Sequence, residues 1–187
     1  MIKALFKFDK HIPQGAKVID TTLNDGIWSE LSPFILSAYP AKRFENLWQF
    51  SKVYSCHVDK NNNIKDCWFE WRNNGFANYK AIRYPMKKGT IPLFSYWQDE
   101  KLDYISARKK IYIPEYSKNV LETNSFKLLQ SLYSSLYEQN ILLILLDFDA
   151  YDYQKLGISL KNVVNNPKRK CGHAFVLLSL LTGEPLI

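Results

Sequence analysis

The chain of 187 residues contains few of the features that mark a secreted or membrane protein. It has only three cysteines, Cys56, Cys67 and Cys171, without regular spacing, so reduced thiols are expected instead of a disulfide framework. The segment from Met1 to Lys10 is too short and too charged for a signal peptide. The longest apolar run, Ile141 to Leu146, is far too short to span a bilayer. The sequence therefore predicts a cytoplasmic protein that makes no membrane contact.

Several motifs of known chemistry are also missing. The sequence has no Gly-rich phosphate loop and no Ser-His-Asp signature, and Cys56-His57 and Cys67 lack the spacing of a zinc site. His173 lies in an apolar segment and is predicted to be a satisfied core residue. We therefore expect neither a metal nor a cofactor.

Positive charge and aromatic side chains, by contrast, are abundant. The formal net charge of +7 favours an anionic partner, such as a nucleotide, a nucleic acid or a phosphorylated metabolite. The basic residues are scattered, which is not typical of a dedicated DNA-binding face. Aromatic residues make up 15% of the chain and serve either as core or as the lining of a pocket for flat rings.

The chain has no repeat or linker, so one domain over residues 1–187 is predicted. Its pattern indicates an α+β fold, mostly helical, with a few short strands. Strands are expected at 3–8 and 17–19, and the apolar run 141–148 is either a buried strand or a buried turn of helix. Helices are expected at 41–54, within 68–84, at 97–113 ended by Pro114, at 116–139 with a break near 123–125, and from Asn166-Pro167 to about Leu181, with Gly183 just past its end.

The predicted helix 41–54 carries the strongest chemical pattern. At about 100° per residue, Glu45, Gln49 and Lys52 share one narrow stripe, flanked by Trp48. One interpretation is an ordinary solvent face. The other is a carboxylate held in a pocket by an amide and an ammonium group, where it activates water or stabilises a cationic sugar.

Two further segments suggest ligand contacts. Asp147 and Asp149 follow the apolar run and would share one face of a strand, as in a cation or substrate site. The same stretch resembles the first motif of haloacid-dehalogenase phosphatases, which needs further downstream strands. Lys168, Arg169 and Lys170 are expected in the first turn of the last helix, where they form either a phosphate site or a solvated basic turn.

The spacing of Glu45, Gln49 and Lys52, after an aromatic segment Trp28–Phe34, resembles the NADAR family, also called YbiA-like. The segment from Gly172 to Leu181 is similar to the C-terminal helix of that family, and Asp147 or Asp149 stands where the family has an acidic residue. Asn46 stands where the family usually has His.

This resemblance implies a YbiA-like fold and a hydrolase that cleaves a ribosyl carbon–nitrogen bond, of the N-glycosidase or ADP-ribosyl glycohydrolase type. The family's substrates imply a nucleotide-like small molecule or ADP-ribosylated nucleic acid as partner. The resemblance also implies that Glu45 is the catalytic carboxylate and that Asp147 or Asp149 is a second one. Candidate substrate-binding residues are Trp28, Trp48, Gln49, Lys52, Trp68, Trp71, Lys168 and Arg169. The main alternative is a non-catalytic nucleotide-binding or nucleic-acid-binding protein, and a small accessory protein is a third class.

Overall fold

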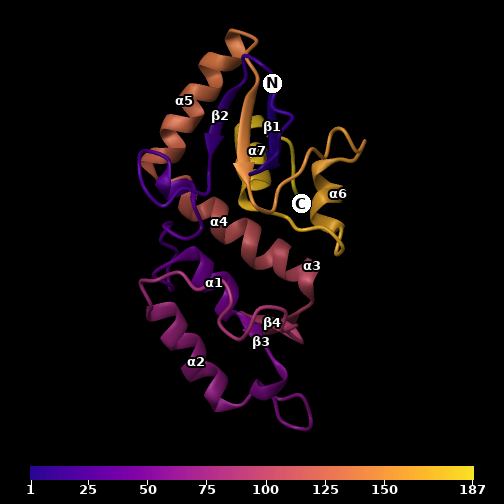
Figure 1. The fold of residues 1–187 in the computed structure, drawn as a ribbon. Coiled ribbons are helices and arrows are strands. Elements are labelled where there is room, and N and C mark those ends of the chain that lie inside the picture. Colours follow the sequence, from indigo (N-terminus) through magenta and orange to yellow (C-terminus); the bar gives the residue numbers. More distant parts are fainter.

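A computed structural model describes residues 1–187 as a mixed α/β fold with two small sheets (Figure 1). One region holds a parallel sheet with helices against it, and the other holds an antiparallel sheet with three helices. A single hydrophobic core of 36 buried residues extends through both regions. Helices hold more of the chain than the short strands do, as the sequence pattern predicted. None of the helices combines the length and the apolar character needed to cross a membrane.

The parallel sheet consists of β1 (Ile2–Phe6), β6 (Leu143–Asp147) and β2 (Lys17–Asp20), in that order. Strand β6 is central and pairs parallel with both neighbours, so that Leu143 lies opposite Ile2 on one side and Lys17 on the other. All five residues of β6 are buried. A strand covered on both faces needs a continuous apolar run, which explains the sequence from Ile141 and settles it as a strand.

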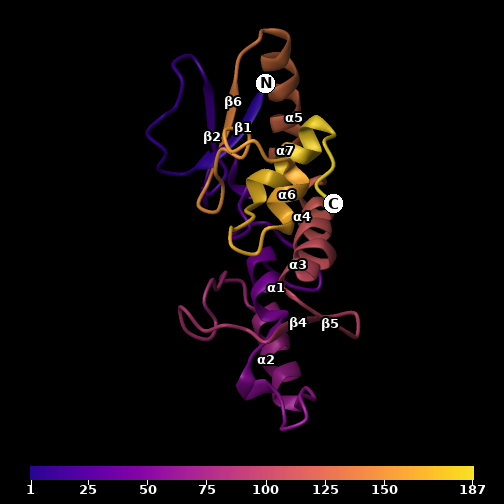
Figure 2. The ribbon, with the colours of Figure 1, turned by 90° about the vertical axis from the view of Figure 1, so that its right-hand side faces the viewer.

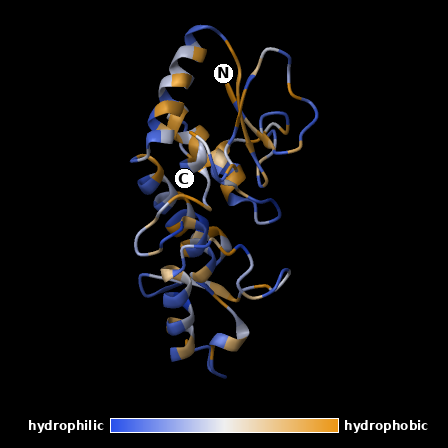
Figure 3. Cartoon of the chain, turned by 60° about the vertical axis from the view of Figure 1, so that its left-hand side comes forward, coloured by the Kyte–Doolittle hydropathy of each residue, from blue (hydrophilic) through white to orange (hydrophobic).

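Three helices lie on one side of this sheet: α5 (Asn124–Glu138), α6 (Leu160–Asn165) and α7 (His173–Thr182). Helix α4 (Ile113–Val120) packs against α7. Figure 2 shows α5, α6 and α7 on one side of the strands and the connection between β1 and β2 on the other. Helix α7 contacts β1, β6 and α4 and is buried along most of its length. Figure 3 shows hydrophobic and hydrophilic segments on the helices of both regions.

The second region contains α1 (Phe44–Phe50), α2 (Asp66–Ala77), α3 (Tyr104–Ala107) and the antiparallel sheet β3 (Lys52–Val53), β4 (Phe94–Trp97) and β5 (Glu100–Leu102). Helices α1 and α2 approach closely because Gly75 has no side chain. A Cβ at this position would lie 2.1 Å from the ring of Phe50. Short turns of 3-10 helix, η1 (Ser29–Leu31) and η2 (Ser55–His57), and a π-helical turn, η3 (Arg108–Tyr112), complete the fold.

The helix expected at 41–54 is shorter than predicted. Helix α1 ends at Phe50, and Ser51 closes it by donating its hydroxyl hydrogen bond to the carbonyl of Leu47. The chain then pairs Lys52 and Val53 with β4. Pairing within a sheet formed by distant residues thus overrides the local helical pattern.

The helix expected at 97–113 is also partly wrong. Its first part is the β4–β5 hairpin, which turns at Gln98 and Asp99 in the left-handed region, at φ of 47° and 62°. Pro114 does not end the helical stretch either, since it lies in the first turn of α4, which continues directly from residues 108–112 in a π-helical turn. The break near 123–125 is confirmed, with Thr123 capping α5.

The last helix begins at His173 and not at Asn166-Pro167. Asn166 accepts a hydrogen bond from Lys168 N at 3.0 Å and so starts a turn, and the residues up to Gly172 form a loop. The helix preceding this loop, α6, was not predicted. The expected end is confirmed, since α7 stops at Thr182 and Gly183 adopts a left-handed φ of 75°.

Candidate functional site

A cavity of about 300 Å³ opens between the two regions of the molecule. It is lined by the polar side of α1, the end of β6, the beginning of α7 and the loops that precede these elements. The residues predicted for a site that line it are Glu45, Trp48, Gln49, Lys52, Asp147 and Asp149. The fold therefore brings together the two segments that the sequence singled out separately.

A chain of hydrogen bonds orders the α1 side of the cavity. Lys52 Nζ donates to Gln49 Oε1 at 2.6 Å, and Gln49 Nε2 donates to Glu45 Oε1 at 2.9 Å. Because an ammonium group only donates, Lys52 fixes which end of the Gln49 amide faces Glu45. Glu45 Oε2 forms no hydrogen bond within the protein and is not sealed off from the cavity. One carboxylate oxygen is thus oriented by the protein and the other is free for a ligand.

Burial changes the acid–base behaviour of both charged groups in this chain. Glu45 is only 7% exposed, and removal of its carboxylate from water raises the pKa, against the opposing hydrogen bond from Gln49 and the charge of Lys52. Burial lowers the pKa of Lys52 to about 8, although Glu45 acts in the opposite direction. A carboxylate with a raised pKa in a cavity is suited to act as a general acid or base.

Trp48 forms part of the same wall. Its ring lies 4.9 Å from Lys52 Nζ and packs edge-on against Tyr112 and obliquely against Tyr104. Trp48 itself is 8% exposed, whereas Tyr104 is 45% exposed. The aromatic surface that a ligand meets is therefore shared between Trp48 and the more open ring of Tyr104.

Asp147, on the β6 side of the cavity, is held by the protein at both oxygens. Its Oδ1 accepts a hydrogen bond from Asp149 N at 3.0 Å, and its Oδ2 accepts one from Ala174 N at 3.1 Å. The second bond satisfies a free N–H in the first turn of α7. Gly172 makes this approach possible, since a Cβ there would lie 2.0 Å from Asp147 Oδ2.

His173 completes the environment of Asp147. Its Nδ1 lies 3.1 Å from Asp147 Oδ2, and its Nε2 lies 2.9 Å from the carbonyl oxygen of Thr21. Both ring nitrogens thus have hydrogen-bonding partners within the protein. His173 is buried, as predicted, but it also lines the cavity and fixes the carboxylate beside it.

Asp149 differs from Asp147 because it faces the opening of the cavity. Its Oδ2 lies 3.3 Å from Arg83 Nη2, and its Oδ1 lies 2.8 Å from Lys170 Nζ. Two cations therefore share one carboxylate, which leaves an excess of positive charge at the opening.

Asn46 places Arg83. Its side-chain nitrogen donates to the carbonyls of Asn78 at 2.9 Å and Lys80 at 3.0 Å, and its oxygen accepts from Ile82 N at 2.8 Å. The side chain is completely buried and follows Glu45 directly in α1. Asn46 thus ties the helix that carries Glu45 to the loop that carries Arg83.

Arg108 shapes the opposite loop. It is 2% exposed and donates through Nη1 to the carbonyls of Val164 at 3.0 Å and Asn166 at 2.9 Å, and through Nη2 to Arg169 O and Tyr104 Oη. The π-helical turn η3 begins at this residue, and such turns frequently occur at functional sites. Arg108 therefore holds the loop that delivers Lys170 to the cavity.

Other predicted residues lie outside the cavity. Trp68 is fully buried and donates its indole N–H to Lys52 O at 2.9 Å, and Trp71 packs against Phe50. Trp28 packs against the core. Lys168 and Arg169 are exposed in the loop before α7, so their expected place in a helical first turn is wrong.

The sequence pattern missed Arg108, and it did not reveal that Asn46 anchors the loop before Arg83. The one available signal for the loop anchor was Asn46 itself, a third polar residue beside Glu45 and Gln49 in a short helix. No three His, Cys, Asp or Glu side chains gather in a group that could hold a metal ion.

Comparisons with known proteins give no independent guide to this site. A scan against models of protein families, a search of curated proteins and a search of solved structures each find no match to this chain. The geometry of the cavity is therefore the guide to the function of this protein.

Proposed function

We propose that this protein is an N-glycosidase that hydrolyses a ribosyl carbon–nitrogen bond in a nucleotide-like or ADP-ribosylated substrate. The observation that carries the proposal is the buried carboxylate of Glu45, with one oxygen oriented by Gln49 and the other free toward a cavity. A solvent-face role for Glu45 does not agree with its burial.

The chemistry follows from where charge develops. As the bond between ribose and base breaks, its electron pair leaves with the base and the anomeric carbon gains oxocarbenium character. The free oxygen of Glu45 stabilises that positive charge and accepts a proton from the water that attacks the carbon. The base takes up a proton from solvent as it departs, and Glu45 returns to solvent the proton that it took from the attacking water. Gln49 and Lys52 keep the carboxylate in place, so little reorganisation is needed during the reaction.

The size and lining of the cavity agree with such a substrate. About 300 Å³ lies at the lower end of the range for small-molecule sites, which fits a nucleoside better than a dinucleotide. Trp48 and Tyr104 offer ring surfaces for a flat base on the Glu45 side.

The two aspartates have different roles in this proposal. Asp147 already accepts hydrogen bonds at both oxygens, so we assign it to positioning, through Asp149 and the start of α7. Asp149 faces the opening and, with Arg83 and Lys170, contacts the polar part of the substrate.

We also propose a distant relationship to the NADAR family, with a YbiA-like fold. It is supported by the convergence of Glu45, Gln49 and Lys52 in one cavity and by the close packing of Gly172 at the start of α7. The chain differs at Asn46, which here anchors a loop.

The proposal is tested with purified protein and a panel of NAD, ADP-ribose, riboflavin-pathway phosphates and ADP-ribosylated guanine DNA. Mass spectrometry measures released base or ribose phosphate. We expect wild type to release one of these, and Glu45→Gln to be about 10²–10⁴-fold slower with an unchanged fold. The control Glu138→Gln, an exposed carboxylate on α5, should retain full activity. Equal activity of Glu45→Gln would refute the assignment, and binding without release by wild type would favour a non-catalytic nucleotide-binding protein.

A further inference from the structure

An array of exposed aromatic rings extends from the cavity to the sheet edge. The rings of Phe6 and Phe8 lie 5.7 Å apart, and those of Phe8 and Phe148 lie 5.9 Å apart, each pair edge to face. Phe6, Phe8 and Phe148 are 42%, 64% and 38% exposed. Phe148 also lines the cavity. The array therefore starts at the opening of the candidate active site and continues over the beginning of the connection between β1 and β2.

These rings are not part of either core cluster. Three neighbouring phenylalanines with this exposure form an apolar surface that folding alone does not require. Contiguous apolar surface of this kind typically marks an interaction site. Its continuity with the cavity indicates that it contacts the same ligand or a part attached to it.

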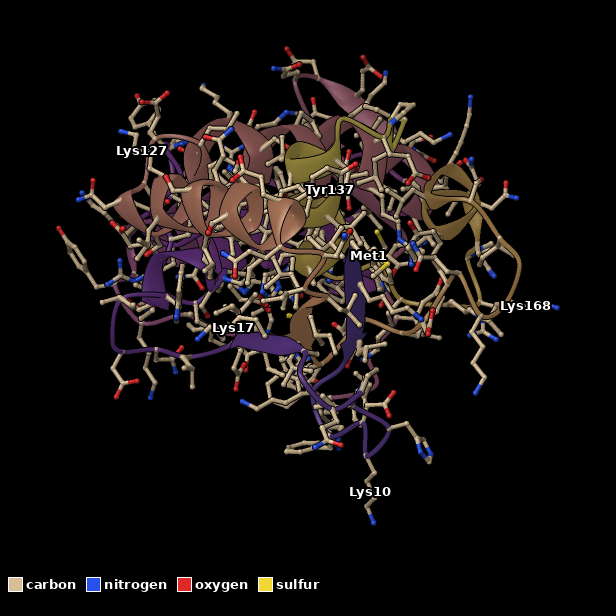
Figure 4. All side chains as sticks on the ribbon, turned by 90° about the horizontal axis from the view of Figure 1, so that it is seen from above. Met1, Lys10, Lys17, Lys127, Tyr137 and Lys168 are labelled. Carbon is tan, nitrogen blue, oxygen red and sulfur yellow. The ribbon has the colours of Figure 1, made fainter.

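Cations accompany the rings. Lys7 Nζ lies 4.8 Å from the centre of the Phe148 ring, and the guanidinium of Arg83 lies 5.7 Å from it. Lys7 is balanced by Asp20 at 3.1 Å, whereas Arg83 and Lys170 share the single carboxylate of Asp149. Figure 4 shows Lys10 projecting from the connection between β1 and β2 into solvent.

We propose that Phe6, Lys7, Phe8, Phe148 and Arg83, here called the aromatic strip, bind single-stranded nucleic acid whose target nucleoside enters the cavity. The target's role as substrate rests on the proposed function, but the binding does not. Exposed rings interleaved with cations suit single strands, because bases stack on the rings while phosphates contact the cations. A cavity for one nucleoside beside such a strip fits one unstacked base with stacked neighbours. A duplex keeps its base faces covered and would not use the rings.

The test is fluorescence anisotropy with labelled, unmodified single strands of about 12 nucleotides, one of DNA and one of RNA. We expect wild type to bind, and Phe8→Ala to bind about tenfold more weakly because one stacking ring is lost. The matched control is Tyr137→Ala, which removes an exposed aromatic ring from α5, on the other side of the sheet (Figure 4). This control should bind as wild type does. Circular dichroism checks that each variant is folded, and Lys7→Gln provides a second variant of the strip.

Salt and strand competition complete the experiment. If about three phosphates are contacted, affinity should fall about 20-fold between 50 and 200 mM salt. Unlabelled single strand should displace the label and duplex should not. Absence of binding, equal loss in Phe8→Ala and Tyr137→Ala, or equal competition by duplex would overturn the inference.

The inference and the proposed function can fail separately. Release of base from a free nucleotide, without binding of any single strand, would overturn the role of the aromatic strip and leave the N-glycosidase proposal intact. Binding of single strands that depends on Phe8, without hydrolysis of any substrate, would support the strip and count against catalysis. Tighter binding of the DNA strand or of the RNA strand would identify which nucleic acid the aromatic strip binds.

Discussion

The two sides of the cavity hold carboxylates that are equally buried but differently used. Glu45 on the α1 side and Asp147 on the β6 side are 7% and 3% exposed. Asp147 accepts hydrogen bonds from two backbone N–H groups and faces His173, whereas Glu45 has one side-chain donor and one free oxygen. Burial therefore does not distinguish a reacting group from a structural one. The distinction lies in how much hydrogen-bonding capacity the protein leaves unused.

The cations Arg108 and Lys52 also differ in how much of their hydrogen-bonding capacity the protein uses. Arg108 donates four hydrogen bonds, to three carbonyls and a tyrosine hydroxyl, and so holds a loop in place. Lys52 has a single hydrogen-bond acceptor in Gln49 and faces the cavity. The donors of Arg108 are thus used up in holding a loop, whereas the half-buried Lys52 keeps donors free toward the cavity.

The largest effect is expected when each carboxylate is converted into its amide. Asp147→Asn turns an NH₂ group toward an existing donor, and we expect a loss of about 3–5 kcal/mol in the free energy of unfolding. At about 2–4 °C per kcal/mol for a chain of this size, the melting temperature should fall by roughly 10 °C. Glu45→Gln should change it little, because Gln49 is the only side-chain donor involved. Equal melting temperatures for the two variants would contradict the division of roles.

A smaller effect is expected from Gly172→Ala. The added Cβ would meet Asp147 Oδ2 at 2.0 Å, so either the start of α7 or β6 must shift, at a cost of about 1–3 kcal/mol. Gly75→Ala is the matched control, because it creates a similar clash with Phe50 outside the cavity. Urea unfolding measures both losses. Only Gly172→Ala should also change KM for the substrate, and an unchanged KM would show that Asp147 does not position the site.

The smallest effect concerns pH. With a pKa of about 8, Lys52 is charged below that pH and loses its proton above it, which weakens the link through Gln49 to Glu45. We expect kcat/KM to fall about tenfold per unit above pH 8. Lys52→Arg stays charged throughout, so this basic limb should disappear. If kcat/KM of Lys52→Arg still falls above pH 8, a group other than Lys52 causes that fall.

The sequence was sufficient for local features of the fold. The continuous apolar residues before Asp147 predicted a buried element but left open whether it is a strand or a helix. The break near Thr123 and the helix end before Gly183 were predicted from local chemistry. The grouping of Glu45, Gln49 and Lys52 also held. Gln49 and Glu45 lie one turn apart on α1, and Lys52 reaches them from the strand that follows.

The remaining features depend on contacts between distant segments. Lys52 and Val53 are in a strand because β4 pairs with them, and the loop before α7 is fixed by Arg108, far earlier in the chain. Lys168 and Arg169 were expected in a helix because Asn166-Pro167 has the local chemistry of a helix start. No local pattern reports that a guanidinium will bind the carbonyls of that segment, or that Asn46 will hold the loop before Arg83.

The central position of β6 also has a consequence for folding. Strands β1 and β2 leave the ribosome early, but neither pairs with the other, and their common partner is synthesised only near the end of the chain. At about 5–20 residues per second, the early strands wait several seconds with unpaired edges. Contacts of such large sequence separation also slow folding. Because Asp147 ends β6, the cavity is among the last parts of the molecule to form, and nascent chains without β6 have no site.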